Sequence, residues 1–225
     1  AIEALDEDNP VREKLKAMHE KQIDQQIGSI EGDWALLVDM SGSMQHAVEA
    51  GRIIAAVLAR MVKGTIKMVF FNNNARGLDV SGRDYNWIYA QTALLVAAGG
   101  TSIGAGLECI MDNNFKADAI AIITDGAENV HPRFAAVYKE YVKKYDRKVP
   151  VYIYQLKGSD KPEHTTYFYN SLREIELVPQ VFDLREQKVD MYSVPNLVQS
   201  MRVNRYSLVD EIMATPLLSL DQVLA

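Results

Sequence analysis

Short, continuous apolar runs alternate along this chain with longer segments whose apolar residues follow a helical spacing. The runs at residues 34–38 and 119–124 are flanked by polar residues, which is typical of strands buried on both faces. Residues 44–62 follow the first run and carry an apolar stripe at helical spacing. Because parallel strands need a crossover long enough to hold a helix, the alternation predicts a doubly wound α/β fold, a mostly parallel sheet flanked by helices.

The same patterns divide the rest of the chain into elements. Strands are expected at residues 34–38, 65–71, 119–124, 151–156 and 178–182, with a short edge strand at 75–80. Helices are expected at residues 11–27, 44–62, 85–98, 103–112, 131–146, 166–175 and 195–206. We therefore expect a helical extension at 1–31, one domain at 32–206 and a tail or further helix at 207–225.

Composition narrows the class of protein. The chain has 225 residues, of which 48% are hydrophobic, so it can bury a sizeable core. Its 30 acidic and 24 basic residues leave a net charge of -6, which opposes non-specific binding to nucleic-acid phosphates. No apolar stretch reaches the roughly 20 residues that a membrane-spanning helix needs, and we recognise no signal peptide.

Cysteine use and the first residue lead to further expectations. Cys109 is the single cysteine, so no internal disulfide can form, which favours a reducing compartment. We expect a cytoplasmic protein with Cys109 in its core. The chain begins with Ala1 rather than methionine, and we expect a fragment of a longer protein.

Oxygen-bearing side chains follow two of the predicted strands. Asp39, Ser41 and Ser43 form an Asp-x-Ser-x-Ser turn after the run at 34–38, and Asp125 follows the run at 119–124. The carboxyl ends of parallel strands meet at one edge of a sheet, where ligands bind. Carboxylate and hydroxyl oxygens suit hard cations such as Mg²⁺, so the pattern predicts a metal site.

A third segment completes a known arrangement. Thr101 follows Gly99-Gly100, and Asp125 precedes Gly126. Taken singly, each segment has an ordinary structural use as a turn or, for Thr101, as a helix cap. Together and in this order they resemble the metal-ion-dependent adhesion site of von Willebrand factor A domains, and the resemblance extends over residues 32–206.

The resemblance implies specific roles for the five side chains. It implies that Ser41, Ser43 and Thr101 coordinate the ion directly, whereas Asp39 and Asp125 act largely through bound waters. It also implies Mg²⁺, with Mn²⁺ or Ca²⁺ as alternatives, and a protein partner that offers a Glu or Asp carboxylate. We expect the double change Asp39→Ala and Ser41→Ala to abolish this binding and to leave the fold largely intact, because the ligands are taken to lie on an exposed loop.

Catalytic alternatives fit the motifs poorly. An aspartyl phosphatase usually has a second acid two residues after its nucleophile, where this chain has Ser41. The Gly-x-Ser-x-Gly turn of serine hydrolases is absent around Ser41 and Ser43. No phosphate-binding loop with its lysine occurs. We expect no enzymatic activity.

Other side chains near the motifs carry two interpretations each. His46, His131, Glu128 and Asn129 could line the binding rim. Ordinary surface positions are favoured for the two histidines, and capping of the next helix is at least as reasonable for Glu128 and Asn129. His19 and His164 show no zinc-ligand spacing. Aromatic residues also cluster, and helical spacing of the first cluster favours packing against the sheet over base stacking. The clusters are Tyr138, Tyr141 and Tyr145, and Tyr167, Phe168 and Tyr169.

Two alternatives to a protein-binding module remain open. A helix before the first strand makes the chain similar to the carboxyl-terminal part of Ro-type RNA-binding proteins, in which RNA would bind only through the parent protein. The chain also resembles regulatory subunits of ATPase or chelatase complexes. Helical repeats upstream in the parent sequence would favour the first alternative, and an ATPase module the second.

Overall fold

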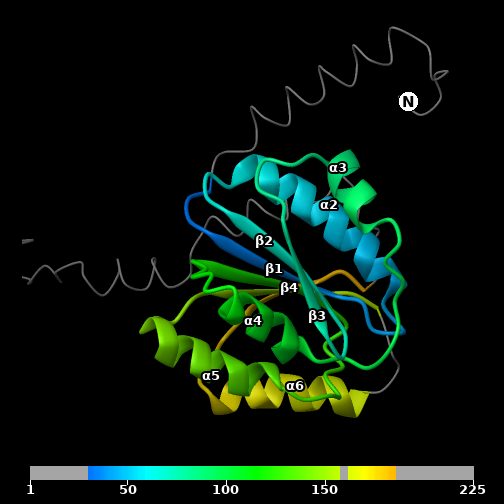
Figure 1. Ribbon diagram of the computed structural model, residues 1–225. Helices are drawn as coiled ribbons and strands as arrows, with labels where there is room; N and C mark the ends of the chain where they lie inside the picture. Colours follow the sequence, from blue (N-terminus) through cyan, green and yellow to red (C-terminus); the bar gives the residue numbers. More distant parts are fainter. Residues whose placement is uncertain (1–29, 158–161, 186–225) are drawn as a thin grey trace, which may run out of the picture.

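Six strands form one sheet in the order β3-β2-β1-β4-β5-β6 in the computed structural model, which describes residues 30–157 and 162–185 (Figure 1). Only β3 runs antiparallel to its neighbour. The strands are β1 (Trp34–Asp39), β2 (Ile66–Phe71), β3 (Ala75–Asp79), β4 (Ala119–Thr124), β5 (Val151–Gln155) and β6 (Gln180–Asp183). The predicted doubly wound, mostly parallel sheet is confirmed, including the edge strand at 75–80.

Helices cover both faces of the sheet (Figure 1). The helices are α2 (Gln45–Met61), α3 (Tyr85–Thr92), α4 (Ile103–Asp112), α5 (Phe134–Tyr145) and α6 (Pro162–Glu174). Figure 1 shows α2 and α3 together on one face and α4, α5 and α6 on the other. The expected helices at 11–27 and 195–206 and the tail at 207–225 lie outside the described residues.

The side chains of β1 explain why the central strand is apolar throughout. Trp34, Leu36 and Val38 pack into the core on the α2 face, and Ala35 and Leu37 pack into the core on the opposite face. Successive residues of a strand point to opposite faces, so a strand with two covered faces needs apolar side chains at every position. The continuous apolar runs of the sequence are therefore the central strands of this sheet.

Close packing between α2 and β1 depends on Gly51. A Cβ atom at this position would lie 2.6 Å from a methyl group of Val38, closer than such atoms approach in proteins. The glycine therefore lets α2 lie directly against β1, the strand that ends at the candidate site.

Three helices differ from the expected ranges, two of them because hydrogen bonds from other segments determine their ends. The helix expected at 85–98 ends at Thr92, whose carbonyl accepts a hydrogen bond from Arg52. The helix expected at 131–146 begins at Phe134, whose backbone N–H donates to the side chain of Glu128. The helix expected at 166–175 begins earlier, at Pro162, a residue suited to the first turn.

Two further expectations can be compared with the structure. Cys109 packs against the core but is only partly buried, so the expected full burial was wrong; its sulfur lies beside Gly77 of β3, near the edge of the sheet. In residues 30–157 and 162–185, the helices are too short or too polar to cross a membrane.

Candidate metal centre

The candidate site lies where the winding of the sheet reverses. From β1 the chain proceeds outward to β2 and β3, and it then crosses to the other side of β1 to form β4. Parallel sheets of this kind bind ligands beside the carboxyl ends of the strands at the reversal point. Asp39 is the last residue of β1 and Asp125 directly follows β4, so both carboxylates lie at this point.

Asp39 is a buried carboxylate with hydrogen bonds to both oxygens. Its Oδ1 accepts from the backbone N–H of Ser41 at 2.8 Å, and its Oδ2 accepts from the hydroxyl of Thr124 at 2.7 Å. Burial and, to a smaller extent, the charge of Asp125 raise the pKa of Asp39 to about 6, although hydrogen bonds from Ser41 and Thr124 oppose the increase. A cation beside these two carboxylates would relieve their repulsion.

The burial of Asp39 corrects one expectation about its loop. Asp39 is fully buried and Ser41 is only 2% exposed, so these two residues are not exposed, although Gly42 and Ser43 of the same loop are. Replacing Asp39 by alanine would leave the Thr124 hydroxyl and the Ser41 N–H without their acceptor. The double change Asp39→Ala and Ser41→Ala would therefore disturb the fold as well as the site.

The hydroxyl of Ser41 is the most unusual polar group of the candidate site. Its Oγ is buried and lies near the Asp39 carboxylate, whose pKa it helps to lower, but it makes no hydrogen bond of normal geometry within the described part of the chain. Buried hydroxyl groups are normally paired, because leaving one unpaired costs about 1–3 kcal/mol. A metal ion that accepts this oxygen as a ligand would satisfy it.

Ser43 connects the first loop to the loop after β4. Its hydroxyl donates to Oδ2 of Asp125 at 3.3 Å. The other oxygen of Asp125, Oδ1, accepts from the backbone N–H of Ala127 at 2.8 Å. Ser43 is exposed and Asp125 is 5% exposed, so this pair lies at the boundary between the core and solvent.

The loop that contains Thr101 is tied to both of the other loops. Gly42 donates its backbone N–H to the carbonyl of Gly99 at 3.1 Å, which joins it to the first loop. The Thr101 N–H donates to Oδ1 of Asn129 at 2.9 Å, and the Thr101 carbonyl accepts from the backbone of Asn129 and Val130 at 3.0 Å each. The structure thus brings together the three segments that hold the five predicted residues.

Ser102, rather than Thr101, caps the helix that follows. The Ser102 hydroxyl accepts from the Ala105 N–H at 3.2 Å and donates to the Pro132 carbonyl at 2.7 Å. The alternative structural use of Thr101 as a helix cap is therefore wrong, because its neighbour Ser102 is the cap. Thr101 is 3% exposed, and its hydroxyl is not needed to begin α4.

The donor set at this edge suits a hard divalent cation. It contains three hydroxyls and two carboxylates, Ser41, Ser43, Thr101, Asp39 and Asp125, and oxygen ligands of this kind are those that Mg²⁺ and Ca²⁺ prefer. Within residues 30–157 and 162–185, no group of three or more His, Cys, Asp and Glu side chains could hold a metal ion. The candidate centre therefore depends on hydroxyl oxygens as much as on carboxylates.

Glu128 is not a rim residue. It is fully buried, and its Oε1 accepts from the backbone N–H groups of Ile103, Gly104 and Phe134 at 3.0, 3.2 and 2.9 Å. One carboxylate thus caps the first turns of α4 and α5. Burial raises its pKa to about 7, although the three hydrogen bonds oppose the increase. The sequence indicates a cap for the following helix, but nothing local indicates the bond to α4.

The remaining candidates have surface or packing positions. Asn129 is exposed, but its side chain holds the Thr101 N–H and so supports the site from beside it. His46 and His131 are exposed. Tyr138 and Tyr141 are buried and donate to backbone carbonyls of Val149 and Ala117, so the first aromatic cluster packs in the core as its spacing predicts.

Comparison with known proteins identifies the fold. The sequence matches no family model, and no curated protein resembles it in sequence. The von Willebrand factor type A protein from Catenulispora acidiphila is similar in structure, with a TM-score of 0.51 and 15% identity over 76% of this chain. The chain spans 42% of that protein's length.

Two further solved structures are similar across nearly their whole length. The vWF domain of the type V pili tip protein Mfa5 from Porphyromonas gingivalis has a TM-score of 0.53 and 11% identity, covering 87% of this chain and 99% of that one. An aerotolerance-related membrane protein from Bacteroides fragilis has a TM-score of 0.50 and 15% identity, covering 75% and 96%. This chain therefore has the fold of von Willebrand factor type A domains.

Proposed function

We propose that this chain is a protein-binding module that uses a divalent cation, Mg²⁺, to bind an acidic group of a partner. Ser41, Ser43 and Thr101 would coordinate the ion directly, and Asp39 and Asp125 would act through bound waters. The observation that carries the proposal is the buried Ser41 hydroxyl, which makes no hydrogen bond of normal geometry in the described part of the chain and lies near the Asp39 carboxylate, which the charge of Asp125 repels.

The contacts of Asp39 support an indirect role for this residue. Both of its oxygens already accept hydrogen bonds from the protein, so the carboxylate is oriented by its own loop and by β4. An ion held mainly by neutral hydroxyls retains most of its positive charge. It can then accept a Glu or Asp carboxylate from a partner at an open coordination position. The proposed function includes no catalytic step.

The test is Mg²⁺-dependent capture of a partner by variants in which the buried residue Asp39 is left unchanged. We expect the full chain to capture a partner from its native extract in MgCl₂ and to lose it in EDTA. The double variant Ser41→Ala and Ser43→Ala should lose the captured protein, because it removes two proposed ligands but keeps the Asp39 carboxylate and the backbone N–H of residue 41 and the Thr124 hydroxyl that donate to it. The matched control is Thr166→Ala, an exposed residue of α6.

Capture by the double variant equal to that of the wild type would contradict the metal-bridge proposal. Capture that persists undiminished in EDTA would contradict it as well. The Ro-type and the ATPase or chelatase alternatives stay predictions. Analysis of the captured material for RNA and for an ATPase subunit tests them in the same experiment.

A further inference from the structure

An uncharged apolar segment lies between α3 and the Thr101 loop. We call residues 93–98 the apolar rim; they read Ala-Leu-Leu-Val-Ala-Ala. Leu94 is 95% exposed and Val96 is 72% exposed, whereas Leu95 between them packs against the core on the α2 face. The side chains of Leu94, Leu95 and Val96 therefore point outward, inward and outward in turn, and those of Leu94 and Val96 project into solvent.

The apolar rim is built directly against the candidate metal centre. Ala98 donates its backbone N–H to the carbonyl of Met40 at 2.9 Å, and Ala97 donates to the side chain of Gln45 at 2.9 Å. The Ala98 carbonyl accepts from the side chain of Asn72 at 2.9 Å. Met40 lies between Asp39 and Ser41, so the end of the rim is hydrogen-bonded to the loop that carries these predicted ligands.

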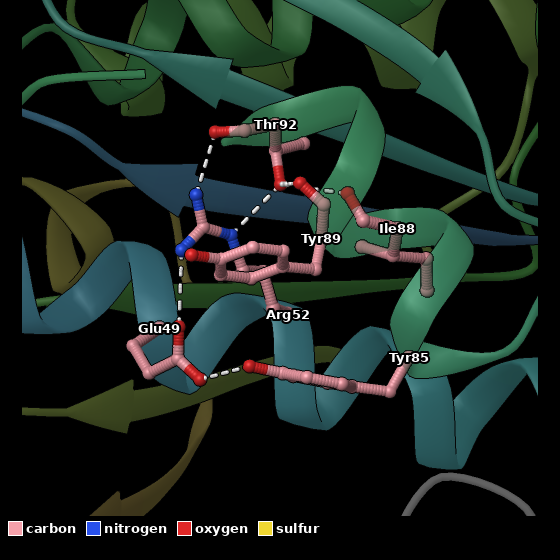
Figure 2. A network of polar contacts seen from close by, with 6 residues as sticks. All are labelled: Glu49, Arg52, Tyr85, Ile88, Tyr89 and Thr92. Carbon is pink, nitrogen blue, oxygen red and sulfur yellow. Dashed lines mark hydrogen bonds and ion pairs between the residues drawn. The ribbon is translucent and has the colours of Figure 1, made fainter. Parts of the chain in front are cut away.

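The beginning of the rim is anchored by a buried arginine (Figure 2). Arg52 of α2 donates from Nε to the Thr92 hydroxyl at 2.7 Å and from Nη2 to the Thr92 carbonyl at 2.6 Å. Its Nη1 donates to Glu49 at 3.0 Å, and the guanidinium carbon lies 4.9 Å from the ring centre of Tyr89. Thr92 immediately precedes the rim, so the rim is held at both ends.

A rim that is held at both ends suits binding. Ordering a mobile loop reduces affinity, whereas a segment already in one conformation avoids most of that loss. Exposed Leu and Val side chains beside a binding site gain from being covered by an apolar group of a partner. The backbone bonds leave the side chains of Leu94 and Val96 as the parts that a partner would contact.

We propose that the apolar rim and the metal centre form one binding surface for a protein segment that carries a Glu or Asp with a large apolar side chain within a few residues. This inference rests on the proposed function. Charge determines which part of the partner binds at each place. Asp39 and Asp125 repel an acidic side chain unless a cation lies between them and it. The apolar rim carries no charge that would attract an acidic side chain. The carboxylate therefore binds the ion, and the apolar side chain covers Leu94 and Val96.

The experiment selects binders from a random library of short displayed peptides, with the full chain as bait in MgCl₂ and in EDTA. We expect peptides enriched only in MgCl₂ to contain an acidic residue and a nearby Leu, Ile, Phe or Trp. The affinity of one enriched peptide is then measured with the double variant Leu94→Ser and Val96→Ser. It should fall about tenfold while remaining Mg²⁺-dependent, because the lost contact is apolar.

The control is Val178→Ser, which removes an apolar side chain that is 62% exposed before the amino end of β6, at the opposite edge of the sheet. This variant should bind the peptide as the wild type does. Acidic peptides enriched without an apolar preference, or unchanged affinity in the rim variant, would overturn the rim inference and leave the metal centre standing. Enrichment that is identical in EDTA, or none in MgCl₂, would overturn the proposed function and the inference with it.

Discussion

At the scale of single residues, Ser41 is the residue whose environment best distinguishes a ligand-binding loop from a loop that serves the fold alone. Its hydroxyl is buried and makes no hydrogen bond of normal geometry within the described chain, so it contributes little to the stability of the metal-free fold. Ser43 and Asp125, by contrast, contact each other directly. A turn that served the fold alone would place no unpaired hydroxyl at this position, because alanine would be at least as stable there.

Ser41→Ala should therefore separate metal binding from stability. We expect the free energy of unfolding without metal to stay within about 1 kcal/mol of the wild type or to increase, since an unpaired buried hydroxyl is removed. The increase in melting temperature that MgCl₂ produces in the wild type should be lost in the variant, because stabilisation by a ligand follows its affinity for the folded state. Thermal unfolding with and without MgCl₂ measures both. An equal Mg²⁺ effect in variant and wild type would show that Ser41 is not a ligand.

At the scale of elements, two long-range contacts determine where helices begin and end. Glu128 caps α4 and α5 at once, and Arg52 binds the end of α3 from α2. Both contacts position loops of the candidate centre: Glu128 supports the start of α4 beside Thr101, and Arg52 anchors the apolar rim. The helices thus hold the site through their ends rather than through their faces.

The titration of Glu128 should appear as a pH dependence of stability. Its pKa is raised in the fold from 4.5 to about 7 by burial, so the folded protein binds this proton more tightly than the unfolded chain. Glu128 therefore contributes stability that is fully present below pH 4.5 and is lost as the pH rises through about 7, about 3 kcal/mol in all. Glu128→Gln, neutral at every pH, should flatten the change in unfolding free energy across this range in urea denaturation.

The matched control for this pH series is Glu140→Gln, an exposed residue of α5. Its profile should keep the slope of the wild type. A Glu128→Gln profile as steep as that of the wild type would show that the proton is bound elsewhere.

The anchor between Arg52 and Thr92 should be visible in Thr92→Val. Valine keeps the shape of threonine but removes the hydroxyl that accepts from Arg52, leaving a buried donor without its acceptor. We expect a loss of about 1–3 kcal/mol in unfolding free energy. Amide hydrogen exchange of Leu95, Ala97 and Ala98 should become faster, while the amides of β1 and β4 stay protected.

Lys63→Ala is the control variant for the stability and hydrogen-exchange measurements on Thr92→Val. Lys63 forms an ion pair with Glu31 at 2.9 Å, and both side chains are largely exposed. Exposed ion pairs contribute less than about 1 kcal/mol. This variant should therefore leave both stability and exchange in the rim nearly unchanged. Rim amides that exchange equally slowly in Thr92→Val would show that the contacts with Met40 and Gln45 suffice to hold the segment.

At the scale of the whole molecule, the strand order makes the site possible. The segments with Asp39 and Asp125 are far apart in sequence, but β1 and β4 are paired neighbours, with Val38 opposite Ile123. The chain leaves these two strands toward opposite sides of the sheet, which opens space at their carboxyl ends. The helices α2 and α4 that follow the first two loops cover opposite faces, so the loops converge from both sides of the sheet (Figure 1).

The sequence by itself determined the α/β class, the central strands and the loops that carry the five predicted ligands. These features are local, because periodicity identifies a strand or helix and the loops directly follow apolar runs. The helix at 103–112 and the strand at 119–124 match the structure to the residue for this reason.

Only the tertiary structure decided where α3 ends and that Asp39 and Ser41 are buried. It also revealed the double cap by Glu128, the Arg52 anchor and the apolar rim. Each depends on contacts between residues far apart in sequence, such as Arg52 with Thr92 or Glu128 with Ile103. Local periodicity carries no information about such pairs, because they are set by how the layers pack around the sheet.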